Sequence, residues 1–451
     1  MEKCNVSPMY KNKGNRNSPG SYRPTSLTSV AGKVMESIIC DNLLDHLLSN
    51  SLLCDEQHGF RPKCSCLTNL LAMLDKMTEA VENGENLDVI YIDFAKAFDK
   101  VPHQRLLKKV KSYGVDGNLL DWLQDFLVNR AQQVVLNGVS SSFHSVTSGV
   151  PQGSVLGPIL FLIFINDLPE NLRCTVSLFA DDVKILSCVN NTQNKEHLQD
   201  DINNLCNWCT EWQMKLNVDK CKVMHMGRTN PGNKYFLSSN SEQSNLTTTI
   251  AEKDLGVLFD NELRFSQHIQ QKVNKGMKMA GLIRRSLEYL DKESFSYLFK
   301  SLVRPHIEYC MPIWKPKLRR DKIAIENVLR RSSKWIPGLE NLEYEDRLRM
   351  LNLPSMSYRH DCGDMIEVFK ILHGFYDINP YPMILDKSTT RGHSYKLVKP
   401  FCHRTTRKDM FFNRIINNWN SLASTVVNAL SLNEFKNLLD KHWIEKKYVY
   451  D

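Results

Sequence analysis

The chain has 451 residues, enough for about two to four domains. Hydrophobic residues make up 42% of the chain and charged residues 24%, a balance that is typical of globular proteins and excludes wholesale disorder. The net charge is +8, and residues 261–340 hold 17 Lys or Arg against 8 Asp or Glu, so one internal segment carries the whole excess. Such a basic segment indicates either a polyanionic partner or a solvated helix face.

Neither a membrane segment nor a disulfide framework is indicated. The longest apolar stretch, residues 155–165, is too short to cross a bilayer, and the polar start of the chain does not have the form of a secretory signal. The 13 Cys residues have no framework spacing, which favours free thiols in a reducing compartment. We therefore expect an intracellular protein, in cytoplasm or nucleus, without a membrane partner.

The predicted elements follow from composition and periodicity along the chain. Residues 1–21 form a polar, flexible lead-in, and residues 229–248 form a second polar stretch with one short strand. Helices are predicted over 34–48, 67–81, 156–168 and 198–212, a buried strand over 88–94, and a β-hairpin over 174–189. After residue 260 the pattern is mostly helical. This order predicts an α+β fold with a helical second half.

Three carboxylates lie at the ends of apolar strands. Asp93 ends the strand over 88–94, and Asp181 and Asp182 lie at the tip of the hairpin. A carboxylate at the edge of a buried strand needs a partner, and adjacent carboxylates repel each other unless a cation lies between them. Carboxylate oxygens are the ligands that Mg²⁺ prefers. By itself, the Asp-Asp pair is more typical of a polar hairpin turn than of a metal site.

An ordered series of segments gives these carboxylates a context. The segments are YRPTSLTSVAGKVMESI (22–38), QHGFRPKCSC (57–66), YIDFAKAFDKVPH (91–103), SGVPQGSVLGPILF (148–161), LFADDVKIL (178–186), WQMKLNVDKCKVMHMG (212–227) and KDLGVLFDNELRFSQHI (253–269). In sequence and order they resemble the two fingers motifs, motifs A to D and the primer-grip region of reverse transcriptases. The resemblance is greatest to the reverse transcriptases of non-LTR (LINE-type) retrotransposons.

The resemblance implies a right-hand polymerase fold, with an antiparallel sheet in the palm. Residues 22–260 would form fingers and palm, residues 261–345 a basic helical thumb, and residues 346–451 a helical carboxy-terminal region of unknown role. The implied partners are an RNA template, a DNA primer and deoxynucleoside triphosphates. The thumb would contact the nucleic-acid backbone without regard to sequence.

The resemblance also implies the roles of the carboxylates. Asp93 and Asp181 would bridge two Mg²⁺ ions, for which Mn²⁺ can substitute, with Asp182 assisting. The other motif A carboxylate, Asp99, is expected to order the following turn rather than bind metal. Lys220 resembles the motif D lysine that protonates the leaving pyrophosphate, although a solvated Lys beside a strand would look the same.

Four further residues are implied to bind substrate. Phe98 stands where the family has a steric gate against the 2′-hydroxyl, with a core Phe as the alternative. Arg61 resembles the residue that contacts the incoming triphosphate, with an exposed loop Arg as the alternative. Gln152 and Gly153 resemble the motif B pair that lets the backbone approach the nascent base pair.

No bound zinc is expected. The Cys206 and Cys209 pair lies on a predicted helix without a second pair, and the same applies to the Cys64 and Cys66 pair. The more distant candidates do not have the compact spacing of a zinc knuckle; they are Cys362, His393, Cys402 and His403. Four histidines in the motif block receive no role: His58, His103, His144 and His225.

The function implied by this resemblance is RNA-directed DNA polymerase. Two alternatives share its motifs: a catalytically inactive, nucleic-acid-binding remnant of such an element, and a maturase-type RNA-binding protein. The carboxylates, Gln152 and Arg61 are all present, which argues against an old remnant. A maturase would need an added splicing domain, and residues 346–451 show no DNA-binding or zinc signature for one.

We expect this chain to extend a primer but not to cut DNA. The lead-in before Tyr22 is too short to form a domain, and its only acidic residue is Glu2, so it lacks the ligands of a metal-dependent nuclease. The measurement is nicking of supercoiled plasmid with Mg²⁺ or Mn²⁺. Nicking that copurifies with the protein and persists in Asp181→Asn would reveal a nuclease, which residues 346–451 would then have to supply.

Overall fold

The computed structural model describes residues 2–128, 130–239, 242–377, 383–386 and 392–450. The chain forms two compact units. The first comprises residues 1–61, 87–225 and 230–249, and the second comprises residues 62–86, 226–229 and 250–451. In the described part of the chain, no helix is both long enough and apolar enough to span a bilayer.

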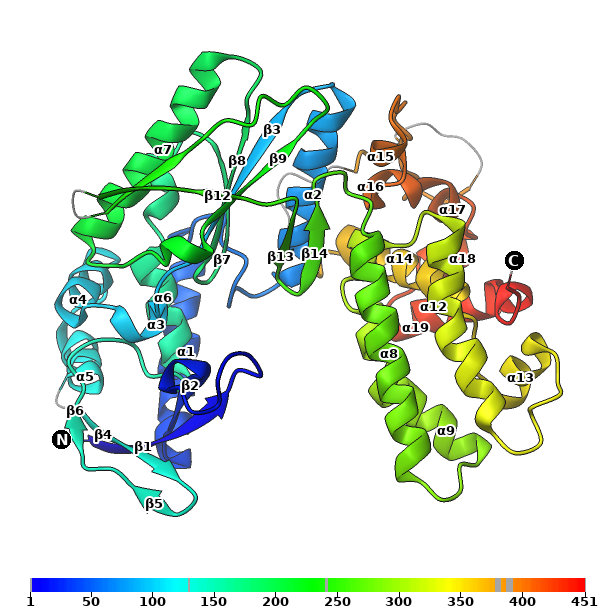
Figure 1. Cartoon of the computed structure of the whole chain (residues 1–451), viewed down its shortest axis with the longest axis horizontal. Helices are drawn as coiled ribbons and strands as arrows, with labels where there is room; N and C mark the ends of the chain where they lie inside the picture. The colour runs from blue at the N-terminus through cyan, green and yellow to red at the C-terminus, as the bar shows by residue number, and fades with distance from the viewer. Residues whose placement is uncertain (1, 129, 240–241, 378–382, 387–391, 451) are drawn as a thin grey trace. The chain divides into compact units, whose positions relative to one another are not determined.

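The first unit mixes strands and helices, which confirms the predicted α+β class for this part of the chain (Figure 1). Its helices are α1 (Val30–Ser49), α3 (Ala97–Lys100), α4 (His103–Ser112), α5 (Gly117–Leu127), α6 (Leu156–Ile165) and α7 (Thr192–Glu211). Its strands are β1 (Glu2–Tyr10), β2 (Tyr22–Leu27), β3 (Leu87–Ile92), β4 (Arg130–Leu136), β5 (Val139–Ser140), β6 (His144–Ser145), β7 (Thr175–Phe179), β8 (Asp182–Cys188), β9 (Lys222–Met226), β10 (Phe236–Ser239), β11 (Glu242–Asn245) and β12 (Thr247–Thr248).

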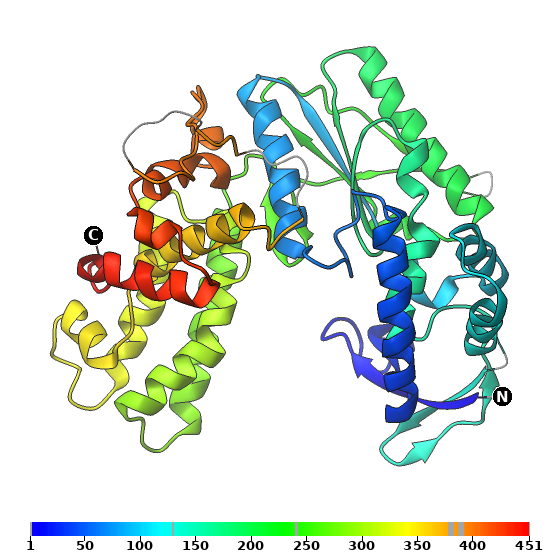
Figure 2. The same ribbon diagram turned by 180° about the vertical axis from the view of Figure 1, so that it is seen from behind.

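One five-stranded sheet has the strand order β12-β9-β3-β8-β7, with β3 at its centre. All six residues of β3 are buried, as the apolar run over 88–94 predicts. β8 pairs antiparallel with both β3 and β7, and the β7–β8 hairpin is the one predicted over 174–189. The core of this unit gathers apolar side chains of the sheet, α6 and α7. Figure 2 shows the sheet and its helices from the opposite side.

A second sheet has the order β2-β1-β4-β5, with β6 also paired to β4. The composition of residues 1–21 predicts a flexible lead-in, but residues 2–10 form β1. This strand pairs antiparallel with β2 and parallel with β4, and Cys4 and Val6 are buried. Backbone pairing on both sides stabilises β1 despite its polar composition, because strand pairing does not require apolar side chains. Likewise, the polar stretch 229–248 contains the two-stranded β10–β11 pair and β12 rather than one strand.

Two helices of this unit are joined through a buried carboxylate. The N-cap residue of α6, Val155, forms no side-chain capping bond. Instead, Glu36 of α1, which is only 3% exposed, accepts hydrogen bonds from Val155 N at 2.7 Å and Leu156 N at 3.2 Å. A carboxylate at a helix amino end satisfies free N–H groups and matches the helix dipole. Only part of the apolar stripe of α1 is core, since Val34 and Ile38 are 58% and 61% exposed.

The second unit is almost entirely helical, as the pattern after residue 260 predicts. Its helices are α2 (Cys66–Glu82), α8 (Ser266–Ser286), α9 (Lys292–Leu298), α10 (Arg304–Glu308), α11 (Met311–Trp314), α12 (Arg319–Ser332), α13 (Tyr344–Leu351), α14 (Met356–Leu372), α15 (Thr405–Lys408), α16 (Phe411–Arg414), α17 (Ile416–Asn420), α18 (Ser424–Val427) and α19 (Leu432–His442). One β-hairpin precedes α8 and consists of β13 (Ala251–Asp254) and β14 (Val257–Asp260).

The carboxy-terminal helices are integral to this second unit. Asp364 of α14, 2% exposed, accepts two hydrogen bonds from Arg414 of α16, at 3.0 and 2.8 Å. Lys315 donates to the same carboxylate at 2.8 Å. Burial opposes ionisation of Asp364, but Arg414 and Lys315 outweigh it and hold the pKa of this carboxyl below its ordinary value. Residues on both sides of position 345 therefore share one buried charge network.

We expect the second unit to lose stability as pH falls from about 6.5 towards 4. His360 and His268 are buried beside Trp314, and burial lowers the pKa of His360 to about 4 and that of His268 to about 3. The unfolded chain binds protons at these positions near pH 6.5, whereas the folded chain does not, so acid favours unfolding. Each histidine contributes a slope of up to about 1.4 kcal/mol per pH unit in this window.

The measurement is the melting temperature between pH 7.5 and 4, compared with that of a His268→Asn, His360→Leu variant. The Asn side chain can still accept the hydrogen bond that Leu258 N donates to His268 Nδ1 at 3.0 Å. The variant should show a flatter pH dependence, whatever its melting temperature at neutral pH. Parallel curves for the two proteins would assign the acid sensitivity to other groups.

Candidate active site

Asp93 follows directly after the central strand β3, and its backbone is held by the segment before β9. Asn217 N donates to Asp93 O at 2.8 Å. The buried Cys221 thiol lies 3.4 Å from Asp93 N and 3.8 Å from Asp93 O, and forms a hydrogen bond with each. These contacts fix the backbone while the carboxylate stays 34% exposed. Asp93 is therefore presented where the central strand β3 ends.

Asp181 lies in the tight turn between β7 and β8. The distant segment 57–59 forms a hydrogen bond with this turn. Ala180, just before it, has a left-handed backbone with φ of 54°. The side chain of Gln57 is 1% exposed, and its Oε1 accepts hydrogen bonds from Ala180 N and Gly59 N, both at 2.8 Å. A Cβ on Gly59 would lie 2.5 Å from Ala180 N, so only glycine fits there. The segment 57–59 (QHG) thus stabilises the turn that carries Asp181.

The two carboxylates interact electrostatically. Burial raises the pKa of Asp181, and the negative charge of Asp93 raises it further. Two cations oppose this effect, Arg23 and Lys220. Lys220 Nζ also donates to Asp93 Oδ2 at 2.9 Å. Lys220 therefore lies against Asp93, and the charges of Asp93, Lys220 and Arg23 all act on Asp181.

Asp182 differs from Asp181 in its place in the fold and in its exposure. It begins β8, where its backbone pairs with Phe179, and its side chain is exposed. Asp181, by contrast, lies in the turn before this strand and is partly buried. Within the described ranges, no group of three His, Cys, Asp or Glu side chains is close enough to hold a metal ion. The structure thus pairs Asp93 with Asp181 and does not gather the expected trio.

The Asp93 and Asp181 pair nevertheless has the chemistry of a divalent cation site. Its hard carboxylate oxygens suit Mg²⁺. The ammonium of Lys220 already contacts Asp93, which shows that a cation can approach this carboxylate. Mutual repulsion and burial leave the pair short of positive charge, a deficit that a divalent cation would fill.

Phe98 is half-buried and lies between two other aromatic rings. It stacks on Phe161 of α6, with ring centroids 4.3 Å apart, and its edge contacts Phe60 at 6.4 Å. The ring is therefore packed against other aromatic rings and remains partly accessible. This position is compatible with both interpretations of the sequence, a steric gate and a core Phe.

Gln152, Gly153 and Asp99 form a connected turn. Gln152 Nε2 donates to Asp99 Oδ1 at 2.8 Å, so Asp99 holds the turn that contains Gln152 rather than the turn that follows Asp99. Gly153 has φ of 108°, and a Cβ there would lie 2.6 Å from Ser26 O. Its glycine is thus required by the close approach of β2. The amide of Gln152 is held by Asp99 rather than by the carboxylate pair.

Arg61 contacts the loop that precedes it in the chain. Its Nη1 donates to Cys54 O at 2.7 Å, its Nη2 lies 3.7 Å from Asp55, and its side chain is only 9% exposed. These contacts belong to the loop that precedes it. Contact of Arg61 with a triphosphate stays a prediction.

Three residues near the site could not be identified as such from the sequence alone. Gln57 and Arg23 lie inside the two fingers motifs, but nothing in their spacing shows that they reach the hairpin turn. Cys221 looks like an ordinary apolar residue before a strand. In each case the signal is a long-range interaction, a hydrogen bond for Gln57 and Cys221 and a charge effect for Arg23, which only the folded chain reveals.

A family model described as "Reverse transcriptase (RNA-dependent DNA polymerase)" matches residues 10–298 of the chain. This chain belongs to the reverse transcriptase family. The predicted right-hand polymerase fold class is confirmed by this membership together with the mixed and helical parts of the structure.

Two of the similar proteins come from mobile elements of Drosophila melanogaster. The chain is 31% identical over 340 residues to the RNA-directed DNA polymerase from mobile element jockey of Drosophila melanogaster, covering 69% of this chain and 36% of the relative. It is 27% identical over 350 residues to the probable RNA-directed DNA polymerase from transposon X-element of the same organism, covering 74% and 37%. The chain thus spans little more than a third of the length of these relatives. The predicted resemblance to non-LTR retrotransposon reverse transcriptases is confirmed.

Among solved structures, the chain is similar to telomerase from Candida albicans in complex with a TWJ fragment of telomeric RNA. The TM-score is 0.42 at 11% identity, and the match covers 78% of this chain and 64% of the telomerase chain.

Proposed function

We propose that this chain acts as the RNA-directed DNA polymerase of a non-LTR retrotransposon. Its substrates are an RNA template, a DNA primer and deoxynucleoside triphosphates. The convergence of Asp93, Asp181 and Lys220 at one end of the central sheet is the observation that supports this most strongly. Family membership alone would not distinguish an intact enzyme from a decayed copy, whereas a preserved carboxylate pair with its supporting contacts favours the enzyme.

In this proposal Asp93 and Asp181 hold two Mg²⁺ ions, with Asp182 assisting from the start of β8. Bound divalent cations would lower the pKa of the primer 3′-hydroxyl and neutralise charge on the leaving pyrophosphate. The hydrogen bonds of Asn217 and Cys221 to the Asp93 backbone keep its carboxylate at the sheet edge. Preorganised ligands of this kind avoid reorganisation during the reaction.

The remaining residues bind substrate or move a proton. Lys220 supplies a proton to the pyrophosphate after exchanging its contact with Asp93 for one with the leaving group. Phe98 excludes the 2′-hydroxyl by contact, and Gln152 and Gly153 shape the surface under the nascent base pair. Arg61 contacts the triphosphate, and we add Arg23 to this role because its charge already acts on Asp181.

The basic segment 261–345 serves as the thumb in this proposal. Its residues 261–340 supply the excess positive charge of the whole chain, and the segment lies within the helical second unit. Its contacts are with phosphates, so binding should weaken with rising salt and show little sequence preference. Residues 1–21, with strand β1, join residues 22–260 as fingers and palm.

Primer extension by the purified chain tests the proposed function. A labelled DNA primer on a homopolymer RNA template with Mg²⁺ should give an ordered ladder of products that requires the matching deoxynucleotide. Replacing Mg²⁺ with Mn²⁺ or Ca²⁺ separately tests the identity of the ion. Template binding without any incorporation would favour the alternative, a catalytically inactive nucleic-acid-binding remnant.

A further inference from the structure

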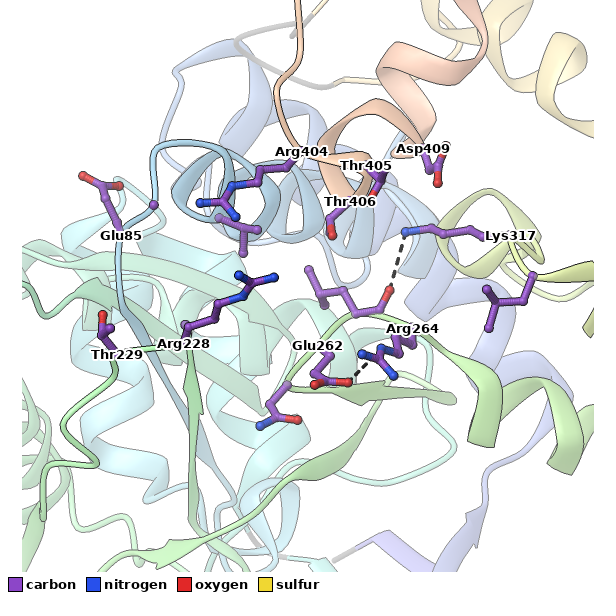
Figure 3. Close-up of a pocket in the computed structure, with 16 residues that line it drawn as sticks. Glu85, Arg228, Thr229, Glu262, Arg264, Lys317, Arg404, Thr405, Thr406 and Asp409 are labelled. Carbon is purple, nitrogen blue, oxygen red and sulfur yellow. Dashed lines mark hydrogen bonds and ion pairs between the residues drawn. The ribbon is translucent and has the colours of Figure 1, made fainter.

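The second unit contains a cavity of about 860 Å³ that the proposed polymerase reaction does not use (Figure 3). It lies among the end of α2, the start of α12 and the segment that leads into α15. Its charged and polar lining comprises Glu85, Arg228, Thr229, Asn261, Glu262, Arg264, Lys317, Arg404, Thr405, Thr406 and Asp409. Small-molecule sites range over roughly 300–1,000 Å³, so this volume exceeds the needs of a single phosphate group.

The backbone segments that carry two arginines of this cavity lie against the end of α2 and the residues that follow it. Glu82 accepts hydrogen bonds from the backbone N–H groups of His403 and Arg404, the second at 2.9 Å. On the other side, Gly227 has φ of 110°, and a Cβ there would lie 2.4 Å from Asn86 Oδ1. This close approach requires glycine and fixes the backbone of Arg228.

The segment that carries Arg404 is fastened a second time to α2. Arg407 Nη1 donates to Asp75 Oδ1 at 2.6 Å, to Asp75 O at 3.0 Å and to Thr78 Oγ1 at 2.9 Å. The Arg407 and Asp75 side chains are 17% and 13% exposed. Hydrogen-bonded ion pairs with this much burial hold their elements more firmly than exposed pairs do. The cavity is thus built on fixed backbone.

The cationic side chains of the cavity differ in whether a nearby group already binds them. Arg264 Nε lies 2.8 Å from Glu262 Oε2, and Lys317 Nζ donates to Leu263 O at 3.5 Å. Over the ranges that the structure describes, Arg228 and Arg404 form no ion pair with a carboxylate. Figure 3 shows their guanidinium groups projecting from opposite sides towards the same part of the cavity.

We propose that this cavity binds a phosphodiester segment of a single nucleic-acid strand, with Arg228 and Arg404 each contacting a phosphate. The inference rests on the proposed function, to which it adds a second contact with the template. Guanidinium groups bind phosphate through paired N–H donors. The hydroxyls of Thr405 and Thr406 are further donors in the lining.

The lining favours a strand over a free triphosphate. A triphosphate would bring several charges into a cavity that also contains Glu85, Glu262 and Asp409. A phosphodiester strand carries one charge per phosphate, which suits two separate guanidinium groups. Val81, Leu263 and Leu318 supply apolar wall for sugars and bases.

The test compares two charge-reversal variants of the full chain. Arg228→Glu with Arg404→Glu alters the cavity, and Lys436→Glu with Lys441→Glu makes the same change of net charge at exposed positions of α19. Binding of a short labelled single-stranded RNA is followed by fluorescence anisotropy at several salt concentrations. The cavity variant should bind at least about tenfold more weakly at 0.1 M salt, because two charge-assisted phosphate contacts are lost.

The salt dependence separates lost contacts from a damaged fold. Each phosphate contact to a single strand contributes about 0.7 to the slope of log K against log salt, so the cavity variant should lose about 1.4. The milder Arg228→Gln, Arg404→Gln variant should lose a similar slope with an unchanged melting temperature. Equal affinity and slope in cavity and control variants would overturn the inference.

Two further measurements distinguish strand binding from triphosphate binding, and distinguish this inference from the proposed polymerase function. If inorganic triphosphate binds the parent chain but not the cavity variant while RNA binding is the same in both, the cavity binds free phosphates and the strand assignment is wrong. Primer extension at saturating RNA should persist in the cavity variant, because the Asp93 and Asp181 pair is intact. A parent chain that binds RNA through the cavity but never extends a primer would refute the proposed function alone.

Discussion

Asp181→Asn should reduce primer extension by at least about 1,000-fold, which corresponds to about 4 kcal/mol of transition-state stabilisation. The substitution preserves the size of the side chain but removes one negative charge from the pair with Asp93, so divalent cations lose an anionic ligand. The measurement is single-nucleotide incorporation on an RNA template at saturating substrate, with RNA affinity measured in parallel by anisotropy.

RNA affinity should change less than twofold in Asp181→Asn, because phosphate contacts are expected on the basic second unit. Asp182→Asn is the matched control, since it makes the same chemical change one residue away on an exposed side chain. It should cost less than Asp181→Asn. Substantial extension by Asp181→Asn, or equally by Asp93→Asn, would refute the two-metal assignment.

Phe98→Val should admit ribonucleotides about 10- to 100-fold more readily relative to deoxynucleotides, a change of roughly 1.4–2.7 kcal/mol in discrimination. The smaller side chain leaves room for a 2′-hydroxyl that the aromatic ring excludes. The measurement is the ratio of kcat/KM for a ribonucleotide and its deoxynucleotide opposite the same template base.

The stack of Phe98 on Phe161 provides a way to separate the gate from the core. Phe98→Val should also lower stability by about 1–3 kcal/mol through loss of this stack. Phe98→Tyr retains the ring and should keep discrimination near that of the parent chain. If Phe98→Val lowers the melting temperature while discrimination stays the same, Phe98 is a core residue only.

Local pattern was sufficient to predict the elements that position the carboxylates. Composition and spacing reveal three of them: the apolar run of β3, the hairpin around Asp181 and the amphipathic helix α7. In each element, the buried side chains recur with the period of that type of secondary structure. The proximity of Asp93, Asp181 and Lys220 came from the resemblance, because no local pattern encodes which strands become neighbours.

The features that escaped prediction depend on contacts between distant segments. Strand β1 is polar and is stabilised by pairing with β4, more than 100 residues away. Gln57 reaches Ala180 across a similar separation, and Arg61 turns to Cys54 rather than outwards. The assignment of α2 to the second unit was also not predictable, since its partners include Arg407 near the other end of the chain.

The central position of β3 has a consequence for synthesis of the chain. Its neighbours in the sheet, β8 and β9, both follow it in sequence, and Leu87 pairs with Cys188. At about 5–20 residues per second, a ribosome completes β8 roughly 5–20 seconds after β3. For that interval an apolar strand with two open edges remains unpaired, which is the condition that promotes aggregation. Slowing translation between residues 92 and 182 should therefore lower the soluble yield, and a chaperone that covers apolar strands should restore it.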